Sequence, residues 1–597
     1  MRVANPIRLT AGTAALFTLL GMLLALSPSA LAQQTVGLTL NDYEQTFDGY
    51  TLVTPLQAPK TFLIDNGGLV VNEWTSSAPA NIGYLRPNGN LVRTAGTTID
   101  PNFAGANGSH GKIEEYDWDG SLVWEYTLSD AQFVLHHDIF IMPNGNILAM
   151  VWEFISDTDA IANGRDPATI AGTSLIPDKL IEIEPTPPVG GNVVWEWRAW
   201  DHIVQDFDNA QANFGVIADH PELINLNFDT QAGDKDWTHC NGIDYNPSLD
   251  QVVVSCRHLH EIWIVDHSTT TAEAAGSTGG TWGKGGDLLY RYGNPQIYDR
   301  GLPTDQVLFF QHDSQWIDAG RPGAGNLIIY NNGPTPAGNI SSADEIVPPT
   351  DMSGNYVITD PDPYGPAAPV WQYTSTPPED FYSVVMSGAE RQPNGNTLIT
   401  EAVTGRLFEV TLAKDKVWEW INPWQSTGPL MQGQLPTPGF IQGNTVFKSR
   451  RYAPDFPGFA GKDLTPGDPL ELLPSAAPLT VPDGSLTASK AGAGDIDVGF
   501  DATSCTSAEY NLVYGSAASI SDYSLAGADC AIGLSGSHVF TPPAGNESLF
   551  FLVVGTDVSG LYESAWGSDS SGMERNLSNA SGLCGATTKP VALSACP

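Results

Sequence analysis

The sequence predicts an all-β fold, a six-bladed β-propeller followed by a small β-sandwich, and two recurrent motifs carry this prediction. The first motif is Pro-Asn-Gly-Asn, which occurs at Pro87, Pro143 and Pro393 and is followed by apolar residues each time. Asn-Gly suits the positive φ angles of a tight hairpin turn. Each copy therefore predicts two adjacent antiparallel strands.

The second motif is Val-Trp-Glu-aromatic, at Val123, Val194 and Val417, with Val-Trp-Gln-Tyr at Val370 as a variant. Each copy tends to follow a strand and a turn, so it predicts an outer strand. Repeats of four short strands, with almost no amphipathic helical pattern, are typical of a β-propeller. At roughly 70 residues per repeat, residues 40–460 predict about six blades.

The first 32 residues have the pattern of a secretory signal peptide. Arg2 and Arg8 precede an apolar run that ends in Ala30-Leu31-Ala32, which predicts cleavage near Ala32. No later stretch has the roughly 18 apolar residues that a membrane-spanning helix needs. We therefore expect a periplasmic or secreted protein in which disulfides are stable.

The region after the propeller predicts a linker and a second domain. Residues 461–485 are rich in Pro and Gly, which is typical of a linker. Residues 486–597 alternate like short strands and contain four cysteines, so we expect a fibronectin-type-III-like β-sandwich. The local pairs Cys505–Cys530 and Cys584–Cys596 are the simplest of three connectivities.

The net charge limits the classes of partner. The chain has 26 Lys and Arg against 67 Asp and Glu, a formal charge of −41. Nucleic acid is excluded as an expected partner, because phosphate binding needs a basic surface. A local cluster of Arg and His stands out against this acidic background.

One such cluster lies in the predicted hairpin of residues 239–257. Pairing Tyr245 with Gln251 places Cys240 opposite Cys256 and His239 opposite Arg257. Because side chains alternate between faces, the cysteines then share one face, and His239 and Arg257 share the other. We expect a Cys240–Cys256 disulfide, with two buried thiols as the alternative.

Two other repeats place histidine at a comparable point of their predicted inner strands, namely His136-His137 and His312. Equivalent positions on different blades converge at one end of a propeller channel. The sequence therefore predicts a pocket in which these histidines meet His239 and Arg257.

These residue types favour chemistry on an anion over metal chemistry. Three histidines can hold zinc or copper, but no open-site metal motif accompanies them and Arg257 would repel a cation. We therefore expect neither a metal ion nor a cofactor. Arg suits an anion with several oxygens, such as a sulfate or phosphate ester. A neutral histidine can attack such a group while others move protons.

The ordered set of these motifs resembles the bacterial aryl-sulfate sulfotransferase family over residues 40–460. The resemblance rests on His136-His137-Asp138, His239 with Asn241, Arg257, His312-Asp313, and the segments 387–411 and 447–461. It implies a six-bladed propeller that moves a sulfuryl group from a phenolic sulfate ester to a phenol without a nucleotide donor. It further implies that His312 is the nucleophile, through a sulfohistidine and ping-pong kinetics. His239, Arg257 and one of His136 and His137 would bind the sulfuryl oxygens and assist proton transfer.

Four further residues are candidates for substrate binding: Asn241, Asp313, Trp237 and Trp316. The expected partners are a small aryl sulfate donor and a phenolic acceptor. With water as acceptor, the same site would be a sulfatase. The alternatives are a non-catalytic propeller that binds a carbohydrate or protein ligand, and a quinone-dependent dehydrogenase.

Overall fold

The computed structural model describes residues 34–472 apart from 171–173, 229–234 and 438–442, and residues 486–589 with several further short gaps. The predicted signal peptide therefore lies outside the described residues. Within the described part, no helix is both long and apolar enough to cross a membrane.

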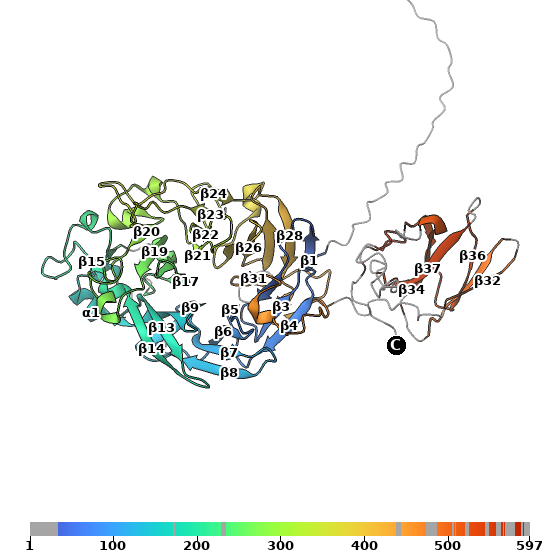
Figure 1. Cartoon of the computed structure of the whole chain (residues 1–597), viewed down its shortest axis with the longest axis horizontal. Coiled ribbons are helices and arrows are strands. Elements are labelled where there is room, and N and C mark those ends of the chain that lie inside the picture. Colours follow the sequence, from blue (N-terminus) through green and yellow to red (C-terminus); the bar gives the residue numbers. More distant parts are fainter. Residues whose placement is uncertain are drawn as a thin grey trace, which may run out of the picture.

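In the described residues up to Tyr452, six sheets of four or five antiparallel strands surround a central space (Figure 1). Ordered from the centre outward, three of them are β5 (Gly83–Leu85), β6 (Leu91–Gly96), β7 (Gly111–Tyr116), β8 (Leu122–Thr127); β9 (Phe133–Ile141), β10 (Ile147–Glu153), β13 (Asp178–Pro185), β14 (Gly191–Arg198); and β17 (Cys240–Asn246), β18 (Gln251–Cys256), β19 (Glu261–Asp266), β20 (Tyr290–Tyr292). The other three are β21 (His312–Trp316), β22 (Leu327–Asn331), β23 (Ser342–Ile346), β24 (Trp371–Tyr373); β25 (Gly388–Arg391), β26 (Thr397–Glu401), β27 (Arg406–Val410), β28 (Lys416–Ile421), β1 (Gly37–Asn41); and β31 (Arg450–Tyr452), β2 (Tyr50–Val53), β3 (Lys60–Ile64), β4 (Val70–Thr75). The molecule is all-β with a propeller-like arrangement of sheets.

Helices and additional short strands lie in connections within and between these sheets. They are α1 (Asp157–Ala162), α2 (Thr271–Ala274) and the two-residue strands β11 (Ile155–Ser156), β12 (Ser174–Leu175), β15 (Ile203–Val204), β16 (Ile224–Asn225), β29 (Trp424–Gln425) and β30 (Gly428–Pro429). Short 3₁₀ turns complete the connections.

Both recurrent motifs have the predicted structure. The Pro-Asn-Gly-Asn segments turn between the two inner strands of their sheets, and their glycines Gly89, Gly145 and Gly395 have φ of +89°, +91° and +95°. The Trp motifs form the outward strands β8, β14, β24 and β28. Every copy of the two motifs therefore forms the turn or the strand that the sequence predicts.

Segments from both ends of the ring complete its sheets. β1 adds to the outer edge of β28, and β31 supplies the innermost strand beside β2. Beyond β31 the chain stays attached, because the Val70 amide donates to the Asp468 carbonyl at 3.1 Å and the Leu472 amide donates to Leu430 at 2.8 Å. Burial is extensive throughout the ring, and Trp side chains such as Trp124, Trp197 and Trp418 are almost fully buried.

The hairpin of β17 and β18 confirms the expected Cys240–Cys256 disulfide and cross-strand pair. The register beyond it differs by one residue, since Tyr245 pairs with Val252 and not with Gln251. A β-bulge between Cys240 and Gly242 absorbs the extra residue. The predicted register was therefore right at the cysteine end and wrong at the turn.

Two three-stranded sheets follow the ring. One contains β32 (Thr487–Lys490), β33 (Ile496–Gly499) and β36 (Ser537–Phe540), and the other β35 (Gly527–Asp529), β34 (Glu509–Ser516) and β37 (Leu549–Thr556). Val498, Tyr510 and Phe540 belong to a shared apolar core.

The disulfide in this region corrects the predicted pairing. Cys530 bonds to Cys584, 54 residues away, so neither Cys505–Cys530 nor Cys584–Cys596 is present. Proximity in sequence favoured disulfides between neighbouring cysteines. In the fold, however, Cys530 at the end of β35 lies beside Cys584 in a loop far along the chain. Cys505 and Cys596 lie outside the described residues.

Candidate active site

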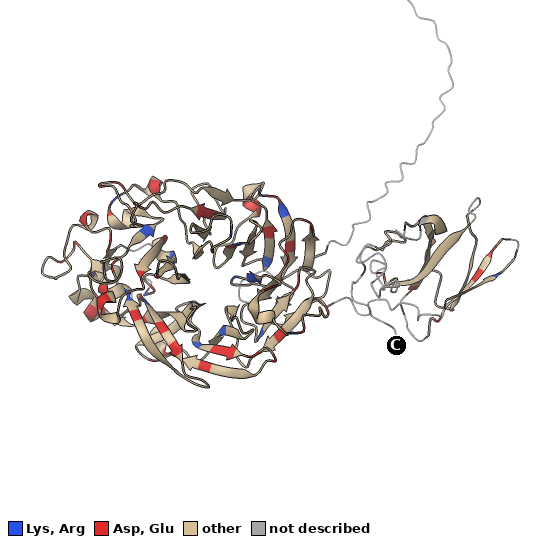
Figure 2. Cartoon of the chain, viewed as in Figure 1, with Lys and Arg blue, Asp and Glu red and all other residues tan. Residues whose placement is uncertain are grey.

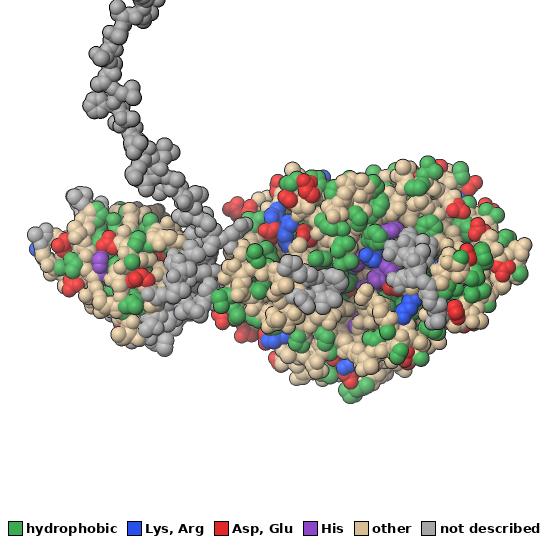
Figure 3. Space-filling model, turned by 180° about the vertical axis from the view of Figure 1, so that it is seen from behind, with side chains coloured by type: hydrophobic (Ala, Val, Ile, Leu, Met, Phe, Trp, Pro, Cys, Tyr) green, Lys and Arg blue, Asp and Glu red, His purple; other side chains and the backbone are tan. Residues whose placement is uncertain are grey.

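A cavity of about 360 Å³ lies where the inner strands of neighbouring sheets meet. Its polar lining includes His137, His239, Arg257, His258 and His312. Its apolar lining includes Leu56, Ala106, Val385, Met386 and Phe447. Figure 3 shows His side chains in a hollow on this face of the ring. The structure therefore brings together three strands' histidines and the one arginine that the sequence singled out.

His312 begins β21 and is held through its Nδ1 atom. Nδ1 lies 2.7 Å from Asn332 Oδ1 and 3.0 Å from the Phe310 carbonyl, and both are acceptors. The Asn332 amide donates to the Ser383 and Met386 carbonyls, which fixes its orientation. The proton of neutral His312 therefore lies on Nδ1, and Nε2 carries the lone pair. Nε2 accepts a hydrogen bond from the Met386 amide at 3.0 Å.

His239 lies just before β17 and is paired with a carboxylate. Its Nδ1 donates to Asp236 Oδ2 at 2.5 Å, and Asp236 is buried. The carboxylate holds the imidazole proton on Nδ1 and leaves Nε2 as the basic atom, as in other His–Asp pairs. Asp236 is a residue that sequence reasoning missed, although it lies only three positions before His239.

The structure distinguishes His136 from His137, which the sequence left open. His137 lines the cavity, whereas His136 is fully buried and stacks on Trp152 at 4.1 Å between ring centroids. His136 Nε2 lies 3.0 Å from Asp178 Oδ1, and its Nδ1 lies 2.9 Å from His137 Nδ1. The carboxylate favours the Nε2–H form of His136, which then accepts from His137 Nδ1–H.

Burial keeps these cavity histidines neutral. Burial, together with the positive charge of Arg257, lowers the pKa of His312 to about 3. Burial and the neighbouring histidines hold the pKa of both His137 and His239 well below the ordinary value. Each imidazole is therefore an unprotonated nucleophile or base at neutral pH.

Arg257 follows β18 and supplies the positive charge of the cavity. Its amide donates to the His239 carbonyl at 3.0 Å, so the two residues lie opposite each other as predicted. Its guanidinium packs over the Phe310 ring at 4.8 Å. Within the part of the chain that the structure describes, its buried Nε atom has no hydrogen-bond partner. A buried donor of this kind is suited to an anion with several oxygens.

Irregular backbone aims these side chains into the cavity. The inner strands β9, β17 and β21 each carry a register shift against their neighbours. His137 and His239 have φ of +50° and +46°, a conformation that costs free energy for residues with a Cβ and gathers at functional sites. Bulges re-aim individual side chains in this way.

A buried ionic cluster adjoins the histidines in sequence, because Asp138 follows His137 and Asp313 follows His312. Lys448 Nζ lies 2.7 Å from both Asp138 Oδ2 and Asp313 Oδ1, and Arg450 donates to Asp313 at 2.8 Å. Arg450 and Lys448 hold the pKa of Asp313 below its ordinary range although burial opposes them. Figure 2 shows some of the Lys and Arg positions at the inner ends of the sheets.

None of the four expected substrate-binding residues is among the residues that line the cavity. Asp313 is engaged by Lys448 and Arg450, and Asn241 donates to the Gln311 carbonyl at 3.0 Å. Trp237 is buried against the Phe228 carbonyl. Trp316 lines a different cavity of about 520 Å³. Phe447 and Met386 instead supply the apolar wall of the cavity. The sequence pointed only to Phe447, which lies in the segment 447–461 of the family resemblance.

The comparison with family models now decides the family. The arylsulfotransferase (ASST) model matches residues 39–422. The chain belongs to the arylsulfotransferase family. No curated protein matches this chain.

Solved structures match this chain at low similarity. A protein of unknown function from Bacteroides caccae is 11% identical, with 63% of this chain and 94% of that chain covered and a TM-score of 0.34. Virginiamycin B lyase from Staphylococcus aureus is 12% identical, with 65% and 85% covered and a TM-score of 0.30. The β-propeller domain of Cps50 from Myceliophteria thermophila is 9% identical, with 65% and 87% covered and a TM-score of 0.30. This arylsulfotransferase is too distant from all three for their activities to bear on its own.

Proposed function

We propose that this arylsulfotransferase is an exported enzyme that transfers a sulfuryl group from a phenolic sulfate ester to a phenol through a sulfohistidine on His312, without a nucleotide donor. Its six sheets would be the six blades of a propeller, followed by a small sandwich domain. The observation that carries the proposal is the neutral His312, held through Nδ1, in a cavity that is also lined by the half-buried Arg257, whose Nε atom is buried.

In the first half-reaction, His312 Nε2 attacks the ester sulfur. The N–S bond forms as the S–O bond to the aryl oxygen breaks, and the phenolate leaves. The Met386 amide must release Nε2 for this step, because it donates to that atom in the free enzyme. Arg257 stabilises the negative sulfuryl oxygens, and Phe447, Met386 and Val385 pack against the aromatic ring.

In the second half-reaction, an acceptor phenol attacks the sulfur of sulfohistidine. His239 Nε2 takes the phenol proton, and Asp236 stabilises the imidazolium that forms, as the carboxylate does in a Ser-His-Asp triad. The new S–O bond forms as the N–S bond breaks, which regenerates neutral His312. His137, whose ring is fixed by His136 and Asp178, keeps an unprotonated Nε2 and would assist proton transfer.

The test is a transfer assay with 4-nitrophenyl sulfate as donor and phenol as acceptor. We expect nitrophenol release that depends on phenol and yields phenyl sulfate in equal amount. His312→Asn should abolish it, whereas His220→Asn, on a histidine outside the cavity lining, should not. Phenol-independent release would indicate a sulfatase, and inactivity of the folded wild-type protein would contradict the proposal.

A further inference from the structure

The cavity contains a second arrangement that the transfer reaction does not use in full. Asp236, His239 and His258 each offer one ligand atom, and these three atoms lie within 4.8 Å of one another. All three residues are buried. His258 has no part in the steps described above.

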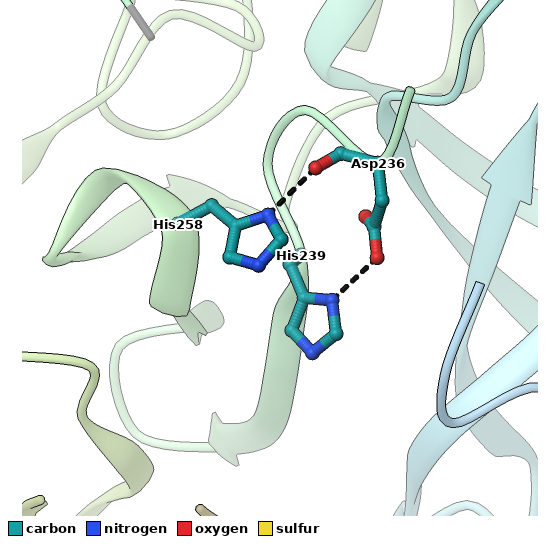
Figure 4. A group of neighbouring side chains, drawn as sticks. All are labelled: Asp236, His239 and His258. Atoms are coloured by element: carbon teal, nitrogen blue, oxygen red, sulfur yellow. Dashed lines mark hydrogen bonds and ion pairs between the residues drawn. The ribbon is translucent and has the colours of Figure 1, made fainter. Parts of the chain in front are cut away.

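Both imidazoles are oriented by the same residue. His239 Nδ1 donates to the Asp236 carboxylate at 2.5 Å, and His258 Nδ1 donates to the Asp236 main-chain carbonyl at 2.6 Å. Figure 4 shows both rings hydrogen-bonded to Asp236, with the Nε2 atom of each ring pointing away from that residue. The rings stack at 4.4 Å between centroids with 23° between their planes. The Nε2 atoms of the two rings therefore lie on the side away from Asp236.

This arrangement is the one that metal-binding histidines use. A ligating histidine almost always donates its other ring N–H to a carboxylate or a backbone carbonyl, which fixes the tautomer and orients the ring. Neutral imidazole pairs suit Zn²⁺ and its neighbours among the divalent transition metals. The carboxylate of Asp236 interacts electrostatically with Arg257 and offsets part of the positive charge of its guanidinium.

We propose that Asp236, His239 and His258 form a binding site for a divalent transition metal ion of the Zn²⁺ class, which inhibits sulfuryl transfer. The His239 and His258 Nε2 atoms are the ligands, and Asp236 holds both rings. Because the ion and the acceptor phenol compete for His239 Nε2, metal binding and the second half-reaction exclude each other. The metal site itself does not depend on the proposed transfer activity. It also departs from the sequence-based expectation that Arg257 would exclude a cation.

The test begins with metal binding and needs no turnover. Tag-free protein, stripped with EDTA and dialysed, is titrated with Zn²⁺ by calorimetry. We expect one equivalent to bind to the wild type, and at least tenfold weaker binding to His258→Gln and to His239→Gln. His220→Gln serves as the matched control, because that histidine does not line the cavity. Circular dichroism establishes that each variant is folded.

Inhibition is then measured with the transfer assay. Zn²⁺ should inhibit the wild type and EDTA should restore its activity, whereas His258→Gln, compared with its own rate without metal, should lose most of the inhibition. Equal Zn²⁺ affinity of the wild type and both folded variants, or no binding by the wild type, would overturn the metal site. Zn²⁺ binding without any transfer activity would overturn the proposed function and leave the metal site standing.

Discussion

At the scale of single residues, each histidine of the proposed mechanism is defined by what its Nδ1 atom contacts. His312 is held by Asn332, His239 by Asp236, and His137 by His136. The ring nitrogen that remains is Nε2 in every case. Only the partner of His239 is charged, so the same imidazole acquires different chemistry: a neutral amide supports a nucleophile, and a carboxylate supports a base.

The Asp236→Asn variant should slow the second half-reaction and leave the first unchanged. The amide cannot stabilise the imidazolium that His239 forms when it accepts the phenol proton. We expect transfer to phenol to slow by about 10²–10⁴-fold, while the first burst of nitrophenol, produced by His312, stays near one equivalent. Rapid-mixing kinetics with 4-nitrophenyl sulfate measures both phases. A loss of the burst equal to the loss of turnover would contradict the role assigned to Asp236.

The pH dependence of the donor reaction reports on His312. Because burial and Arg257 lower its pKa to about 3, Nε2 remains unprotonated throughout the range in which an ordinary histidine titrates. We expect kcat/KM for the aryl sulfate to stay flat from pH 8 to about pH 5, provided that the protein stays folded. A fall with a midpoint near the ordinary histidine pKa of about 6.5 would show a solvated nucleophile instead.

At the scale of elements, bulged inner strands and one loop set the cavity. The loop of residues 105–109 lies against His137, and Gly108 is in contact with its ring: a Cβ on Gly108 would lie 2.2 Å from His137 Cε1. Gly105 also has positive φ, but nothing lies within 4 Å of where its Cβ would be. A side chain at either glycine would strain the backbone, but only a side chain at Gly108 would also collide with His137.

Gly108→Ala should displace His137 and lower kcat/KM by about tenfold or more, because small displacements at a reacting centre are costly. Gly105→Ala is the matched control and should keep near-wild-type activity, since only its backbone conformation is strained. Melting temperatures measured alongside separate stability from activity. Equal activities of the two variants would contradict the importance of this contact.

Sequence patterns predicted regular elements well and irregular ones poorly. The Asn-Gly turns and Trp strands follow from local chemistry, and the Cys240–Cys256 pair follows from strand alternation. The bulge after Cys240 escaped prediction because it lies at the first residues of β17, where too few residues precede it for the alternation pattern to show the shift. Asp236 and Asp178 escaped because their role depends on which loops the fold brings together. The Cys530–Cys584 bond escaped for the same reason.

At the scale of the whole molecule, a buried ionic cluster joins sheets that are distant in sequence. Lys448 bridges Asp138 and Asp313, and all three side chains are at most 1% exposed. Arg450 adds a second cation to Asp313. The cluster connects the last strand of the ring to β9 and β21, at the residues that directly follow His137 and His312. It therefore couples ring closure to the geometry of the cavity.

Lys448→Met should lower the free energy of unfolding of the ring by about 3–5 kcal/mol, because it leaves two buried carboxylates without their shared cation. Lys60→Met removes a cation from an exposed pair with Glu73, with side chains 27% and 49% exposed, and should cost at most about 1 kcal/mol. Urea unfolding followed by Trp fluorescence measures both. Similar costs for the two variants would contradict the structural role of the cluster.

The central claim is that His312 carries the sulfuryl group between the two half-reactions. Its most direct measurement is mass spectrometry of peptides from enzyme mixed with 4-nitrophenyl sulfate without acceptor and quenched under alkaline conditions. We expect one sulfuryl adduct, located on His312, which disappears when phenol is added before the quench. An adduct located on His137 or His239, or transfer to phenol that proceeds with no adduct on the enzyme, would contradict it.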